Sequence, residues 1–112
     1  MMKTMTYNET KAKEVEAAVM QVFNCKLSEV IGVKDTLTKK VVVFILNKLL
    51  EFDKRNIAVA YSMNAYYVPT VVDEIEMMFL IDATTRNKIT EVSKIIGYEC
   101  KSMDTTRNKF VA

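Results

Sequence analysis

Histidine is absent from the sequence, and glycine and proline are almost as scarce. Without histidine this chain alone cannot form Ser-His or Cys-His nucleophile pairs or metal sites with histidine ligands. The only glycines are Gly32 and Gly97, so the glycine-rich loops that hold phosphates are missing too. Neighbouring acids such as Glu14 and Glu16 are interpreted as a solvated helix face. The sequence therefore predicts a protein that is not an enzyme and that holds no metal and no cofactor.

The scarcity of glycine and proline also limits the fold classes that this chain can adopt. Two glycines and one proline leave little material for β-hairpin turns, and the chain is rich in residues that favour helix. A chain of 112 residues is long enough for one core and too short for two. We predict an all-α domain, a small bundle of about five helices over residues 8–97, with a flexible lead-in at 1–7 and a partly mobile tail at 98–112.

Long apolar runs are also lacking. The longest, Val41 to Leu46, is far below the roughly 20 residues that a membrane-spanning helix needs. The N-terminus has no continuous apolar stretch of the kind found in secretory signals. Cys25 and Cys100 are far apart and outside any Cys-x-x-Cys pattern, which is typical of free thiols in a reducing compartment. The sequence predicts a cytoplasmic protein with no membrane partner.

The N-terminal third contains signals for two helices. Asn8 is expected to cap a first helix, which carries apolar residues at helical spacing and ends near Asn24 or Cys25. A short helix is expected over residues 27–32, with Ser28 as its cap. Gly32 is expected to stop that helix by taking a positive φ. Both helices are expected to pack against the segment that follows.

That following segment, Val41–Leu50, is the element around which the chain is organised. It is apolar nearly all round, so it is expected to be a helix packed on several sides, capped by Thr36 or Thr38. Three more helices are expected to complete the bundle, at 57–63, from Pro69 to about Leu80, and at 85–96 with Gly97 as the stop.

Several short motifs run through this series of helices. They are Val19 with Phe23, Ser28-Glu29-Val30-Ile31-Gly32, Lys40 to Leu46, Val59 to Met63, and Thr70-Val71. In this order, over residues 15–96, the chain resembles the C-terminal duplex-binding domain of the bacterial replication initiator DnaA. The resemblance implies a DnaA C-terminal or Trp-repressor-like fold with a helix-turn-helix at about 56–80. It also implies DNA binding in replication or transcription control.

Double-stranded DNA is the partner that this resemblance implies, with a homodimer as a possible binding unit because one small module buries little interface. Lys39 and Lys40 occupy the first turn of the central helix, where acidic residues are usual. Their presence there is consistent with a phosphate contact and equally with ordinary solvent-exposed lysines. The expected DNA contacts are flanking cations and residues at the start of the helix from Pro69 to about Leu80, which would be the recognition helix. They are Lys34, Lys39, Lys40, Lys54, Arg55, Tyr66, Tyr67, Thr70, Arg86 and Lys88, with Arg107 and Lys109 in the tail.

The charge distribution supports an alternative function. Residues 56–83 contain four acids and no lysine or arginine, whereas the segments on either side each carry a net charge of +3. The expected recognition helix is thus acidic where phosphates would lie. The alternative is a protein-protein interaction module that binds a basic or apolar partner. One of the two adjacent tyrosines is expected to close the core and the other to contact the partner. The proposed contact residues are Tyr66, Tyr67, Met77, Asp73, Glu74 and Glu76.

Overall fold

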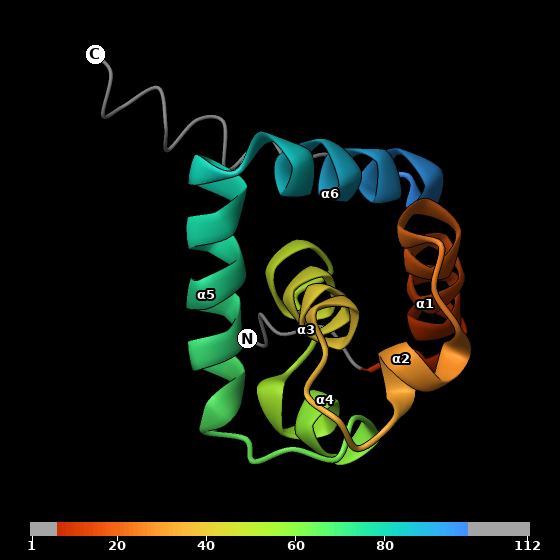
Figure 1. Ribbon diagram of the computed structural model, residues 1–112. Coiled ribbons are helices and arrows are strands. Elements are labelled where there is room, and N and C mark those ends of the chain that lie inside the picture. The colour runs from red at the N-terminus through yellow and green to blue at the C-terminus, as the bar shows by residue number, and fades with distance from the viewer. Residues whose placement is uncertain (1–6, 99–112) are drawn as a thin grey trace.

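Six α-helices and one π-helical segment build the part of the chain that the structure, a computed structural model, describes: residues 7–98 (Figure 1). The predicted all-α class is confirmed. Residues 1–6 and 99–112 lie outside the described range. The predictions for the lead-in, the tail, Cys100, Arg107 and Lys109 therefore fall largely or wholly outside it. None of the helices within 7–98 combines the length and apolar character that crossing a bilayer requires.

Helix α3 (Leu37–Phe44) lies at the centre of the molecule (Figure 1). Helices α1 (Glu9–Phe23), α5 (Tyr67–Ile81) and α6 (Ala83–Ile96) form three sides around it. Residues 41–46 are all 0% exposed, so this stretch is surrounded by protein on every side. The prediction of a central helix packed on several sides is confirmed, and Thr36 is its cap, accepting a hydrogen bond from the Lys39 amide at 3.2 Å.

The second half of the predicted central helix is not α-helical. Residues Ile45–Leu49 form a π-helical turn, η1, in which the Leu50 amide donates to the Ile45 carbonyl at 3.1 Å. The chain leaves this turn through Glu51, which has a positive φ of 62°. A residue without glycine's freedom rarely adopts this conformation, and π-helical turns occur frequently at functional sites. The sequence pattern did not predict this irregular end.

The first helix follows its local sequence closely. The Asn8 side chain accepts a hydrogen bond from the Lys11 amide at 3.1 Å, and Asn24 ends the helix with a φ of 55°. Asparagine suits both positions because its short side chain caps the first turn and it tolerates the left-handed conformation. The apolar face of α1 packs against α3 and α6. The predicted start, end and packing of this helix are confirmed.

Helix α2 (Leu27–Ile31) forms where a short helix was predicted, but two details of that prediction were wrong. Lys26 occupies the cap position, and its amide donates to the Glu29 carboxylate at 3.2 Å, so Ser28 lies inside the helix. Gly32 has a φ of −70° and a ψ of 177°, not a positive φ. Glycine is needed there for a different reason: a Cβ at Gly32 would lie 2.4 Å from the Ser28 carbonyl oxygen.

Replacing Gly32 with alanine is therefore expected to lower the free energy of unfolding by about 1–3 kcal/mol, because the clash is with the backbone. Gly97→Ala is the matched comparison. Gly97 has a φ of 83° and open space where its Cβ would be, so only the conformational cost of about 1 kcal/mol applies. Urea unfolding followed by circular dichroism measures both. An equal or smaller loss for Gly32→Ala would show that the α2 end relaxes without strain.

Helices α4 (Lys54–Ala60) and α5 are joined by residues 61–66. Helix α4 begins three residues before the predicted start because the Asp53 carboxylate caps it, accepting from the Arg55 amide at 3.1 Å. Pro69 lies in the first turn of α5, where its missing amide hydrogen costs nothing. Two successive helices are present where a helix-turn-helix was expected. That this pair is a DNA-binding helix-turn-helix stays a prediction.

Candidate functional site

One side of α5 faces solvent along the whole helix. Its exposed residues are spaced three to four apart and so share one face. Three of them are large and apolar: Tyr66 at the cap, Met77 and Ile81 are 82%, 57% and 74% exposed. Thr70 and Asp73 lie between these apolar residues. We call these five residues the α5 outer face. It combines separated apolar side chains with a carboxylate, and it carries no cation.

The acids of α5 differ in what they contact. The Glu74 carboxylate lies 3.1 Å from the Lys40 ammonium, and that of Glu76 lies 3.3 Å from the Lys48 ammonium. Both pairs connect α5 to the central helix and its π-helical turn. Asp73 forms no ion pair or side-chain hydrogen bond with any residue in the described range 7–98. Asp73 is therefore the α5 carboxylate that remains available to a partner.

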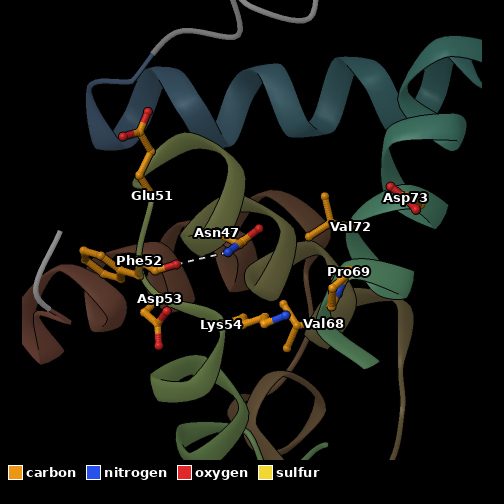
Figure 2. Close-up of a pocket in the computed structure, with 9 residues that line it drawn as sticks. All are labelled: Asn47, Glu51, Phe52, Asp53, Lys54, Val68, Pro69, Val72 and Asp73. Atoms are coloured by element: carbon orange, nitrogen blue, oxygen red, sulfur yellow. Dashed lines mark hydrogen bonds between the residues drawn. The ribbon is translucent and has the colours of Figure 1, made fainter. Parts of the chain in front are cut away.

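A cleft of about 450 Å³ opens beside the start of α5 (Figure 2). The side chains of Val68 and Val72 contribute apolar walls and are buried, whereas the buried Phe52 ring points away from them and its backbone faces Asn47 (Figure 2). Pro69 and Asp73 belong to the exposed side of α5 and also line the cleft, so the cleft is continuous with the α5 outer face. The two features together form one candidate binding surface.

The polar groups of this cleft are mostly hydrogen-bond acceptors. Asp53 and Asp73 contribute carboxylates, against one ammonium from Lys54, and the Glu51 side chain points away from the other lining residues (Figure 2). The Asn47 amide nitrogen donates to the Phe52 carbonyl at 3.0 Å, which leaves the amide oxygen turned to the other side (Figure 2). Negative charge in a partly apolar cleft favours long cationic side chains, whose stems pack while their charged ends meet carboxylates.

Two of the predicted DNA contacts lie inside the protein or in ion pairs. Lys39 is only 2% exposed, and its ammonium donates to the Gly32 carbonyl at 2.9 Å. Lys40 is paired with Glu74 and lies 3.8 Å from the Asp35 carboxylate. The hydrogen bond that the Lys40 ammonium donates to the Glu74 carboxylate is the main cause that raises the pKa of Lys40. Neither lysine presents a free charge to a phosphate.

Two further predicted contacts serve the packing of α6. The Arg86 guanidinium donates to the carbonyls of Phe79 and Leu80 at 3.1 and 3.3 Å, which satisfies the C-terminal end of α5. The Lys88 ammonium lies 5.2 Å from the centre of the Phe23 ring and so links α6 to α1. Both cations are partly buried by contacts within the fold.

The remaining predicted contacts are closer to solvent. Lys34, Arg55 and Thr70 are exposed, and the Lys54 ammonium lies 5.6 Å from the centre of the exposed Tyr66 ring. Tyr67 is half-buried, and its hydroxyl donates to the Asp35 carboxylate; this hydrogen bond is the main cause that raises the pKa of Tyr67. Of the two tyrosines, Tyr66 is thus the one exposed to solvent.

Sequence reasoning missed the cleft beside α5. The sequence pattern predicted no site role for Asn47, Glu51 or Asp53. They come together only because the π-helical turn and the positive φ of Glu51 bend the chain there. No periodic pattern encodes such a bend, so nothing in the sequence indicated this part of the surface.

Comparison with protein-family models, curated proteins and solved structures found no match to this chain. The resemblance to the DnaA duplex-binding domain therefore stays a prediction from the sequence motifs. The functional argument rests on the charges and contacts of the candidate surface.

Proposed function

We propose that this protein is a protein-protein interaction module that binds a basic amphipathic segment on the α5 outer face and the adjoining cleft. The observation that carries the proposal is the charge of this surface. Residues 56–83 contain four acids and no lysine or arginine. Four of the flanking cations, Lys39, Lys40, Arg86 and Lys88, are engaged within the fold.

The chemistry of the surface defines the partner. Tyr66, Met77 and Ile81 offer apolar contacts at helical spacing, and exposed apolar residues of this kind are typical anchors at protein interfaces. Asp73 and the cleft carboxylates are complementary to lysine or arginine. A helix in which basic residues alternate with leucine-like residues would match both features. Such complementarity contributes specificity and speeds association.

A fluorescein-labelled amphipathic peptide of leucine and lysine tests this proposal by fluorescence anisotropy with the full-length protein. Wild type is expected to bind it and to bind the matched leucine-glutamate peptide much more weakly. Asp73→Lys is expected to weaken binding about fivefold to tenfold by replacing attraction with repulsion. Met77→Ala is expected to weaken it about fivefold by removing an apolar contact.

Glu91→Lys is the matched control, because it makes the same charge change on an exposed part of α6. It is expected to leave peptide binding within about twofold of wild type, since a distant rim charge contributes little. If Glu91→Lys weakens binding as much as Asp73→Lys does, the affinity for the peptide depends on the net charge of the protein and not on the position of Asp73. That result, or equal binding of the two peptides, contradicts the proposal.

DNA binding is the second candidate function, favoured by the cations that stay near solvent at one end of the α4–α5 pair. Lys54 and Arg55 lie at the start of α4, and Tyr66 and Thr70 lie at the start of α5. The same anisotropy assay with random duplex DNA at about 50 and about 200 mM salt tests it. Affinity that falls steeply with salt and is lost in Arg55→Glu would favour DNA over the peptide partner.

A further inference from the structure

A second cavity lies on another part of the molecule, at the point where two connections meet. Val33 and Asp35 come from the α2–α3 connection, and Ser62, Met63 and Asn64 come from the α4–α5 connection. Lys39 and Tyr67, from the first turns of α3 and α5, complete the lining. The cavity has a volume of about 410 Å³, which is within the range of small-molecule sites.

Lys39 gives this cavity a buried positive charge. The side chain is almost completely excluded from solvent, and the structure gives its ammonium one hydrogen bond, to the Gly32 carbonyl. An ammonium has three hydrogens to donate, and a buried charge is costly unless its hydrogens are bonded. The side chain lines the cavity, so an acceptor placed there would reach it.

Two residues of the α4–α5 connection add donors to the lining. The Ser62 hydroxyl forms no hydrogen bond within the described residues 7–98. The Asn64 side-chain oxygen accepts from the Tyr66 amide at 2.8 Å, which leaves the amide nitrogen as a donor. The Asp35 carboxylate also lines the cavity; it accepts from the Tyr67 hydroxyl and lies 3.8 Å from the Lys40 ammonium, so it already has two partners within the fold.

We infer that this cavity, the Lys39 cavity, binds a small apolar monocarboxylate. Its carboxylate would accept hydrogen bonds from the Lys39 ammonium and from Ser62 or Asn64. Its apolar body would pack against Val33, Met63 and the Tyr67 ring. Charge-assisted hydrogen bonds to a buried ammonium favour a carboxylate over a neutral amide of the same shape. This site is separate from the α5 outer face, and it does not depend on the proposed peptide binding.

A nitrogen-15 NMR titration of the full-length protein with hexanoate tests the inference, with hexanamide as the neutral match and inorganic phosphate as an anion without an apolar body. Hexanoate is expected to shift amide signals around Val33, Met63 and Tyr67, and to bind about tenfold more tightly than either comparison compound. Equal binding of hexanoate and hexanamide, or no binding of hexanoate, overturns the inference.

Variants test the role of the charge. Lys39→Met keeps the length of the side chain and is expected to weaken hexanoate binding about tenfold or more. Lys34→Met, at an exposed lysine outside the lining, is expected to leave it unchanged. Val33 is exposed at the cavity wall, so Val33→Glu and Val33→Lys can be compared even if Lys39→Met does not fold. Glutamate should weaken binding and lysine strengthen it; identical affinities for these two variants overturn the inference.

Discussion

Tyr61→Ala is expected to lower the free energy of unfolding by about 3–5 kcal/mol, the range for removing a large buried aromatic side chain. Tyr61 follows α4 directly and is 1% exposed in the core. Its hydroxyl donates to the Glu16 carboxylate on α1 at 2.5 Å. The substitution therefore leaves a cavity and also removes a hydrogen-bond donor from a half-buried carboxylate. Urea unfolding followed by circular dichroism measures the loss.

Tyr61→Phe separates these two contributions. It keeps the ring and removes only the hydroxyl, so the expected loss is about 1–3 kcal/mol, the cost of leaving a buried acceptor without its donor. Val59→Ala, at an exposed position of α4, is the control and is expected to change stability by less than about 0.5 kcal/mol. A loss below about 1 kcal/mol for Tyr61→Ala would mean that the surrounding core closes over the vacated space.

Stability is expected to decline steeply as the pH rises above about 10, the ordinary pKa of tyrosine. Burial, followed by the hydrogen bond to Glu16, raises the pKa of Tyr61, and burial is the main cause that raises the pKa of Tyr7. A folded-state pKa above the unfolded value means that the folded protein holds its proton more tightly. The resulting stabilisation is complete below the unfolded pKa and is lost as the pH rises toward the folded pKa. Lys40, whose pKa is also raised, acts in the same direction.

Urea unfolding at a series of pH values from about 7 to about 11 measures this decline, and tyrosine absorbance reports ionisation. In Tyr61→Phe the free energy of unfolding is expected to fall less steeply above about pH 10, because this variant lacks the phenol that ionises only after unfolding. Tyr66→Phe, at an exposed ring, is expected to keep the wild-type profile. Profiles of equal slope for wild type and Tyr61→Phe would assign the alkaline loss to other groups.

Local signals in the sequence were sufficient to predict most of the helices. Asn8 and Thr36 cap helices where expected, and Gly97 ends α6 with a positive φ. These features depend on a residue and its neighbours within one helical turn, which is the range that a sequence pattern describes. The buried stretch at 41–46 was also predictable, because a helix that is apolar all round has no face suited to water.

The features that failed depend on contacts between distant segments or on an irregular backbone. The sequence pattern predicted that Gly32 ends its helix with a positive φ. In the structure, glycine is needed there because the Ser28 carbonyl leaves no room for a Cβ. Lys39 looked like a surface cation, yet it is buried and bonded to Gly32. The sequence shows the charge of a lysine but not the fold around it. Tyr66, Met77 and Asp73 are exposed, as a partner contact would require, but their role in binding stays a prediction, and the cleft beside them was not predicted.

The π-helical turn at Ile45–Leu49 has a consequence for the shape of this surface. A π-helical turn winds more residues around the axis than an α-helical turn does, so its side chains point in other directions than they would in an uninterrupted α-helix. From Val41 to Leu46 the central helix contributes only buried apolar side chains, and immediately afterwards Asn47 lines the cleft. One wall of the cleft is thus continuous with the most rigidly packed element of the core. A partner that enters there would meet a preformed wall and not a loop that must first be ordered.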